Sequence, residues 1–136
     1  MKGYFVDTNL FIRYLTNDDP TKADRVERLL NDAAAGKVRL VTAEMVLAEV
    51  VWVLESAYDL KAAEVAPLVR GILATPGLEV INHSLVEQAL IHYETRNIDF
   101  IDGYIAAVMA KYGLDGLYSF DKKHISRVPG IERKEP

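Results

Sequence analysis

The sequence predicts an α/β fold of the three-layer kind, in which a mostly parallel sheet lies between helices. Short apolar segments typical of buried strands alternate along the chain with longer segments of helical periodicity. The 136 residues contain no internal repeat, low-complexity tract or Gly/Ser linker. Because this length suits one hydrophobic core, we expect a single domain over residues 1–136.

The chain begins with a predicted strand at residues 3–6, followed by a short helix at residues 10–14. Asp19 is a suitable N-cap for the helix predicted over residues 21–35, because Pro20 favours the first helical position.

The middle of the chain continues with a predicted strand at residues 38–41. Thr42 can cap a long apolar helix over residues 42–58, and a further helix is expected over residues 61–74. Pro67 removes a backbone donor from that helix and should kink it.

The last part of the chain repeats the alternation. We expect a strand at residues 78–81, helices at 84–95 and 99–112, a strand at 116–120 and a short strand near Ile131.

Composition excludes several classes of protein. The absence of cysteine rules out a disulfide scaffold, a thiolate zinc site, an iron–sulfur cluster and a cysteine nucleophile, and it is compatible with the cytoplasm. The first residues hold no signal-peptide core. The longest strongly apolar stretch, residues 45–54, is far shorter than the roughly 20 residues of a membrane span. We therefore expect a cytoplasmic protein with no membrane association.

Two acids directly follow predicted strands. Asp7 comes after the first strand and Asp121 after the strand-like residues 117–120. Ligands of open parallel sheets bind beyond the carboxyl ends of the strands, so both carboxylates are candidates for a site there. The alternative is local: Asp7 as a turn or helix-cap residue, and Asp121 as a turn residue.

Glu49 interrupts a run that is otherwise apolar. On a helix it lies beside Met45 and Trp52, so no polar stripe accounts for it. Because an unpaired buried carboxylate is costly, such a group is normally paired, protonated or bound to a metal. The alternatives are a glutamate at the helix edge or one paired with an arginine.

Asp99 and Asp102 begin a helix and share one face of its first turn. As an N-cap and a third helical residue they resemble a capping box, which the helix dipole would also favour. Two like charges so close repel each other, however, and a nearby cation would relieve that repulsion.

Together these acids favour a hard divalent cation. Carboxylates without cysteine or paired histidine suit Mg²⁺ or Mn²⁺ rather than zinc. Such an ion favours phosphodiester hydrolysis, because it lowers the pKa of a bound water and shields the phosphate charge. His83, His92 and His124 have no ligand spacing, and we interpret the first two as surface or structural residues.

Four motifs in order resemble those of PIN-domain ribonucleases, specifically the VapC group of toxin–antitoxin ribonucleases. They are Val-Asp-Thr-Asn at residues 6–9, Ala-Glu-Val-Val-Trp-Val-Leu at 48–54, Asp-Phe-Ile-Asp at 99–102 and Ser-Phe-Asp at 119–121. The resemblance covers nearly the whole chain and implies a parallel sheet of four or five strands, dependence on Mg²⁺ or Mn²⁺, and endonucleolytic cleavage of single-stranded RNA. It also implies a homodimer, for which the helices at 42–58 and 61–74 are candidate surfaces, and inhibition by a cognate antitoxin.

The resemblance also assigns residues. The acidic quartet, catalytic and metal-binding, corresponds to Asp7, Glu49, Asp102 and Asp121, with Asp99 accompanying the third acid as a further metal ligand or only a helix cap. Asn9 and Ser119 match polar residues that support the acids. One position departs from the family pattern, because Lys122 stands where an arginine is usual.

Charge gives a mixed signal about nucleic acid. The formal net charge of −4 argues against a protein that coats nucleic acid by bulk attraction. The quartet acids account for that excess, and the basic stretch that starts at Lys122 lies beside the fourth of them. We expect phosphate contacts from Lys122, Lys123 and Arg13. A second group of basic residues has two interpretations: it contacts RNA phosphates, or it is an ordinary solvated helix face. The group is Arg13, Lys22, Arg25 and Arg28.

The main alternative is a signalling module of the receiver type, which binds Mg²⁺ and accepts a phosphoryl group on an aspartate such as Asp7. A receiver has no use for Glu49 in an apolar helix, and its acidic pair and late lysine are not clear here. A haloacid-dehalogenase-like phosphatase needs an aspartate where Asn9 stands. A catalytically silent PIN-like binding domain would not need the intact acids.

Overall fold

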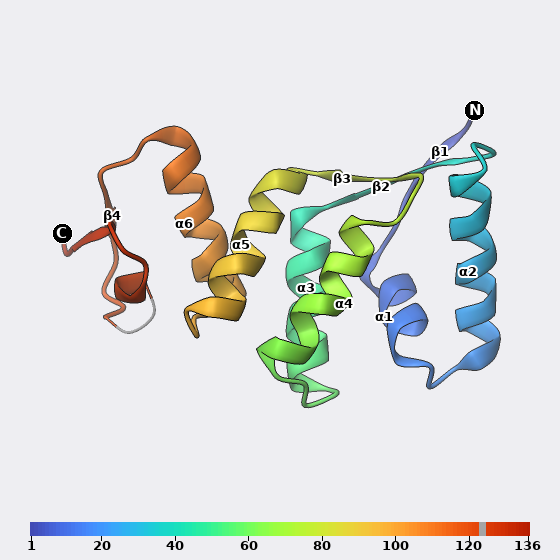
Figure 1. Cartoon of the computed structure of the whole chain (residues 1–136), viewed down its shortest axis with the longest axis horizontal. Coiled ribbons are helices and arrows are strands. Elements are labelled where there is room, and N and C mark those ends of the chain that lie inside the picture. The colour runs from blue at the N-terminus through green and yellow to red at the C-terminus, as the bar shows by residue number, and fades with distance from the viewer. Residues whose placement is uncertain (123–124) are drawn as a thin grey trace. The chain divides into compact units, whose positions relative to one another are not determined.

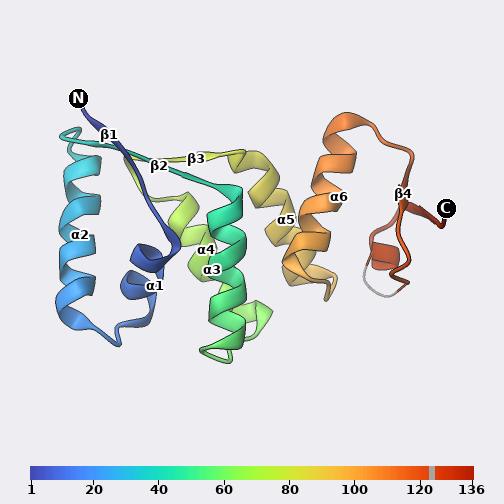
Figure 2. The ribbon, with the colours of Figure 1, turned by 180° about the vertical axis from the view of Figure 1, so that it is seen from behind.

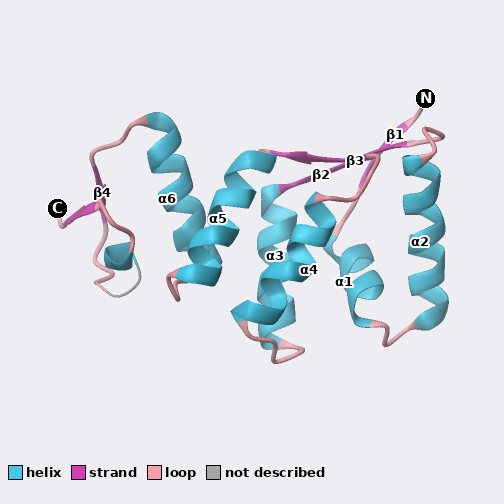
Figure 3. Ribbon diagram, in the orientation of Figure 1, coloured by secondary structure: helices cyan, strands magenta, loops and turns pink. Residues whose placement is uncertain are grey.

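In the computed structural model, strands and helices alternate along the chain as the sequence predicts, and the α/β class is confirmed (Figures 1 and 3). The structure describes residues 1–122 and 125–136. They form two units, Met1–His83 and Ser84–Pro136, here called the N-terminal and C-terminal units. The single domain expected from the sequence stays a prediction. Within the described residues, no helix is long and apolar enough to cross a membrane.

The N-terminal unit contains a sheet of three parallel strands in the order β1-β2-β3. These strands are β1 (Gly3–Phe5), β2 (Arg39–Ala43) and β3 (Leu78–Ile81). The register pairs Phe5 with Val41, so the carboxyl ends of β1 and β2 lie at the same edge of the sheet. Segments that leave these two strands are therefore neighbours.

Four helices complete the N-terminal unit and lie on one side of its sheet (Figure 2). On β3, Leu78 and Val80 are buried, whereas Glu79 and Ile81 are exposed, so the covered face follows the strand alternation. The α3 and α4 helices pack through fully buried aliphatic side chains such as Leu47 and Val65. The helices are α1 (Thr8–Thr16), α2 (Pro20–Ala34), α3 (Glu44–Ser56) and α4 (Ala62–Leu73).

The N-termini of α2 and α3 can be compared with the two N-caps predicted from the sequence. Asp19 caps α2 as predicted, because its carboxylate accepts a hydrogen bond of 3.1 Å from the backbone N–H of Lys22. The prediction that Thr42 caps the next helix is wrong. Thr42 belongs to β2 and its hydroxyl donates to the carbonyl oxygen of Val6, while the N-cap position of α3 is Ala43, which has no capping side chain.

The link from α4 into β3 passes very close to the end of α2. Gly77 has a φ of +79°, and a Cβ atom there would collide with the carbonyl oxygen of Ala33. Only glycine fits this left-handed backbone and this contact between two main chains.

The C-terminal unit contains two helices, a short 3₁₀ helix and a separate sheet of two parallel strands. The predicted sheet of four or five strands is therefore wrong for the described residues: the sheet of the N-terminal unit has three strands, and the last two strands pair with each other. The elements are α5 (His83–Thr95), which starts at the boundary of the units, α6 (Phe100–Tyr112), β4 (Gly116–Tyr118), the 3₁₀ helix (Ile125–Arg127) and β5 (Glu132–Lys134).

Close packing of α5 and α6 depends on a second glycine. A Cβ atom at Gly103 would lie 2.7 Å from the carbonyl oxygen of Ala89 and 3.3 Å from the Cβ of His92. The buried residues Ile98 and Ala106 pack with the segment around the 3₁₀ helix. These contacts fix the start of α6, which carries two of the candidate acids.

Candidate functional site

Asp7 lies where β1 gives way to α1. It is the N-cap of α1, and its Oδ1 accepts a hydrogen bond of 2.6 Å from the backbone N–H of Thr8. The side chain is exposed, and its Oδ2 has no partner among the described residues. The capping role expected as the alternative is thus present, and it leaves one carboxylate oxygen available to a ligand.

Glu49 lies on the exposed side of α3. Met45 and Trp52, one turn away on either side, are 79% and 65% exposed, whereas Leu47 and Val50 on the opposite side are fully buried. The carboxylate therefore bears no burial cost in this structure. It does stand among apolar side chains on that face, as the sequence indicates.

Asp99 and Asp102 lie at the start of α6. Asp99 is the N-cap residue, but its carboxylate makes no capping hydrogen bond and has no other polar partner among the described residues. Only its backbone carbonyl takes part, accepting from the N–H of Gly103 at 2.9 Å. Asp102 follows in the first turn and is half-buried. The Asp99 side chain is thus free for a ligand while its backbone starts the helix.

Asp121 follows β4 and is positioned by Ser119. The Ser119 hydroxyl accepts a hydrogen bond of 3.0 Å from the Asp121 backbone N–H. Ser119 is itself held to β5, since its N–H donates to Lys134 at 2.9 Å and its carbonyl accepts from Arg133 at 2.6 Å. Lys122 is exposed beside this turn. The predicted contact residue Lys123 lies outside the described residues, as does His124.

Sequence reasoning missed Glu44, the first residue of α3. Its Oε2 is buried and has no hydrogen-bond partner among the described residues. Glu44 directly follows β2, the strand beside β1, so Asp7 and Glu44 leave neighbouring strands at the same edge of the sheet. The position of an acid directly after a strand could have identified Glu44. It is overlooked because the predicted strand ends at Val41 and Thr42 is predicted to be a helix cap.

These acids have the chemistry of a magnesium site. Their donors are carboxylate oxygens, several of them exposed, and Glu44 contributes a buried oxygen that a cation would satisfy. Within residues 1–122 and 125–136, no three acids or histidines lie close enough together to hold a metal ion. The metal ligands predicted from the sequence therefore remain predictions. Asp7 and Glu49 belong to the N-terminal unit, and Asp99, Asp102 and Asp121 to the C-terminal unit.

The two described histidines have structural partners. His83 Nε2 lies 3.2 Å from the carbonyl oxygen of Leu73. His92 Nδ1 accepts from Arg96 Nε at 3.2 Å, and burial, with a smaller contribution from the charge of Arg96, lowers the pKa of His92. These contacts support the structural interpretation of both residues.

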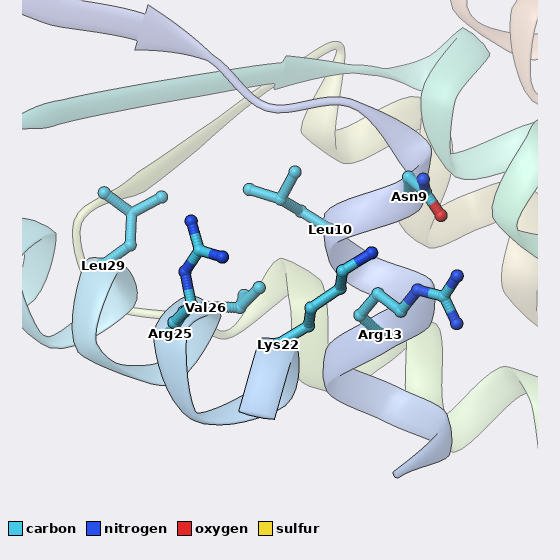
Figure 4. Close-up of a pocket in the computed structure, with 7 residues that line it drawn as sticks. All are labelled: Asn9, Leu10, Arg13, Lys22, Arg25, Val26 and Leu29. Atoms are coloured by element: carbon cyan, nitrogen blue, oxygen red, sulfur yellow. The ribbon is translucent and has the colours of Figure 1, made fainter. Parts of the chain in front are cut away.

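Asn9 and Arg13 lie on α1 and line a pocket between α1 and α2 (Figure 4). Arg13 Nη1 lies 3.6 Å from Asp18 Oδ1. Asp18 also accepts hydrogen bonds from Tyr58 at 2.6 Å and from Thr16 at 2.9 Å, and these bonds, Tyr58 first, lower the pKa of its carboxyl group.

Comparison with known proteins identifies a family and finds similarity to solved structures. The sequence model of a family described as PIN domain matches residues 4–131. The crystal structure of the Mycobacterium tuberculosis toxin VapC20, described as cleaving the sarcin-ricin loop, is 25% identical, with a TM-score of 0.40 over 97% of this chain and 98% of that one. None of the curated proteins compared with the chain matches it.

Proposed function

The chain belongs to the PIN domain family, and from this premise we propose that it is a Mg²⁺- or Mn²⁺-dependent endoribonuclease that cleaves single-stranded RNA. The resemblance to PIN domains is confirmed, and the receiver alternative is not favoured. The observation that carries the proposal is Asp7: it stands at a strand exit, is fixed by its own helix, and keeps one carboxylate oxygen unpaired.

In the proposed mechanism, Asp7, Glu49, Asp102 and Asp121 form the catalytic quartet, and Asp99 joins them as a metal ligand. A bound divalent ion would lower the pKa of the attacking water and shield the scissile phosphate. One carboxylate oxygen of Asp7 accepts a hydrogen bond from the N–H of Thr8. This bond restrains the side chain and so keeps the other oxygen in a fixed place for a ligand. The Ser119 hydroxyl restrains the backbone that carries Asp121, because it accepts a hydrogen bond from the Asp121 N–H.

Basic residues supply the complementary attraction for the RNA. Lys122 is exposed next to Asp121, and we assign phosphate contacts to Lys122, Lys123 and Arg13. Asn9, exposed two residues after Asp7, would support the acid by hydrogen bonding.

We further propose that the protein is the toxin of a toxin–antitoxin pair, active in the cytoplasm and inhibited by a cognate antitoxin. The four motifs at residues 6–9, 48–54, 99–102 and 119–121 support this role, since they resemble the VapC group in order and spacing. A homodimer is part of the same proposal. Co-expression with the product of a neighbouring small reading frame, followed by size-exclusion chromatography with light scattering, tests both partners.

The nuclease proposal is tested with a labelled single-stranded RNA in Mg²⁺, in Mn²⁺ and in EDTA. We expect cleavage with either metal and none in EDTA. Asp7→Asn and Glu49→Gln should each lower the cleavage rate by about 100-fold or more, because each removes a charge that acts on the reacting water or phosphate. Asparagine is chosen at residue 7 because it keeps the helix cap.

A matched control is Glu27→Gln, which removes one exposed acid of α2 that is not part of the quartet. It should cleave at the wild-type rate. Cleavage that persists in EDTA, or in Asp7→Asn at the rate of this control, contradicts the mechanism.

A further inference from the structure

A pocket of about 370 Å³ lies between α1 and α2 of the N-terminal unit. Its size falls in the range of small-ligand sites, about 300–1,000 Å³. The lining side chains come from both helices, three from α1 and four from α2 (Figure 4). The lining residues are Asn9, Leu10, Arg13, Lys22, Arg25, Val26 and Leu29.

The charges of the α1–α2 pocket have one sign. Arg13, Lys22 and Arg25 line it, and no acid does. Three cations gathered at one pocket repel each other, and an anion bound among them would remove that repulsion. The pocket is therefore suited to an anionic ligand.

These cations are poorly neutralised by the protein. Arg25 has no ion pair with any described carboxylate, and the nearest carboxylate oxygen to Lys22 Nζ, that of Asp19, is 4.0 Å away. Arg13 lies 3.6 Å from Asp18, whose oxygens already accept two shorter hydrogen bonds. The Nε of Arg13 is buried and has no acceptor among the described residues. Donors thus remain for a ligand with several acceptor oxygens.

The remaining wall strengthens that attraction. Leu10, Val26 and Leu29 are apolar, and Val26 is buried, so this part of the wall is less polar than water. Lower local permittivity increases the interaction between the cations and a bound anion.

We propose that the α1–α2 pocket binds a backbone phosphate of the single-stranded RNA, one or two nucleotides from the cleaved position. The proposal rests on the proposed function for the identity of the polymer. Arg13 lies six residues after Asp7 on the same helix, about 9 Å along its axis, which places the bound phosphate one or two nucleotides from that acid. This closeness to Asp7 favours RNA over an acidic peptide as the occupant.

The test is RNA binding measured by fluorescence anisotropy over a range of salt concentrations. All proteins carry Asp7→Asn so that the labelled RNA stays intact. Arg25→Gln should weaken binding about fivefold and lower the salt slope by about 0.7, the value for one lost phosphate contact on a single strand. Lys22→Gln should act in the same direction.

Of the four basic residues considered as phosphate contacts from the sequence, Arg28 is the one that does not line the pocket. Arg28→Gln is therefore the matched control: Arg28 is exposed one turn along α2 and donates only to the Asp24 carbonyl, at 3.4 Å. It should leave affinity and slope unchanged. In the background with Asp7 intact, Arg25→Gln should raise KM and leave kcat near the wild-type value, because the contact binds substrate and transition state equally. Equal thermal midpoints verify that the variants fold.

The proposal is overturned if Arg25→Gln and Lys22→Gln bind RNA with the affinity and slope of Arg28→Gln. It is also overturned if they keep RNA binding but lose binding to a fluorescent Asp/Glu-rich peptide, which would assign the pocket to an acidic protein partner. Failure of the nuclease function would be a separate result, in which the wild type does not cut RNA in Mg²⁺. The salt dependence of RNA binding would still show whether the pocket binds a phosphate.

Discussion

The hydroxyl of Thr42 donates a hydrogen bond of 2.9 Å to the carbonyl oxygen of Val6, the residue directly before Asp7. Thr42 is completely buried, and its bond joins two neighbouring parallel strands where both end. Thr42 therefore fixes the backbone next to Asp7, although it is not itself a candidate catalytic or metal-binding residue.

Thr42→Val should lower the free energy of unfolding by about 1–3 kcal/mol, because the change removes the donor and keeps the shape of the side chain. Urea unfolding followed by circular dichroism measures the change. Thr95→Val is the control, since Thr95 is exposed and its hydroxyl bonds one turn back to Ile91. An equal loss of unfolding free energy in both variants would show that the burial of the Thr42 hydrogen bond makes no extra contribution to stability.

Gly103→Ala should destabilise the C-terminal unit by about 1–3 kcal/mol, because the added methyl group meets the main chain of Ala89 at 2.7 Å. Gly71→Ala in α4 is the matched control: no atom lies within 4 Å of the new methyl group. The control should gain about 0.5–1 kcal/mol from helix propensity. Opposite signs in thermal unfolding are expected, and the same sign in both contradicts the contact.

His92 should make the protein less stable in mild acid. Its pKa is lowered in the folded state, mainly by burial, so the unfolded chain binds the proton more readily. The contribution is fully present above the unfolded pKa of about 6.5 and is lost as the pH falls through the lowered folded value. His92→Gln removes this titration, so its stability should fall less than that of the wild type between about pH 8 and pH 5. Parallel curves for the two proteins would exclude the effect.

Metal binding should be visible without RNA. Mn²⁺ at about 100 times its Kd should stabilise the wild type by about 2.7 kcal/mol, seen as a rise in the thermal midpoint. Asp7→Asn should fold normally and show a smaller rise, because asparagine keeps the cap of α1 but loses the charge. A full rise in Asp7→Asn would remove Asp7 from the metal ligands.

Signals that act within a few residues were readable from the sequence. Asp19 and Pro20 start α2 as expected, since a cap and a first helical residue need only their neighbours. Asp7 and Asp121 do follow strands, as the alternation of elements indicated. Whether they act as a catalytic set stays a prediction.

Contacts between distant segments were not readable. A threonine at the junction of a strand and a helix suits either element, and the partner that decides for the strand, Val6, lies 36 residues away. The pairing of β4 with β5 likewise depends on a register that no local pattern contains. The exposure of Glu49 could not be predicted because apolar residues surround it on every side of α3.

Gly77 has a consequence for genetics. Its backbone touches the end of α2, and the other end of that helix carries Lys22 and Arg25. Any side chain at residue 77 would push against the end of α2, and because a helix is rigid its other end would move as well. A screen for inactive variants would therefore recover Gly77 beside the true site residues. Its mutants would be recognised by their reduced solubility and early melting, whereas substitutions of the acids leave a protein that accumulates normally.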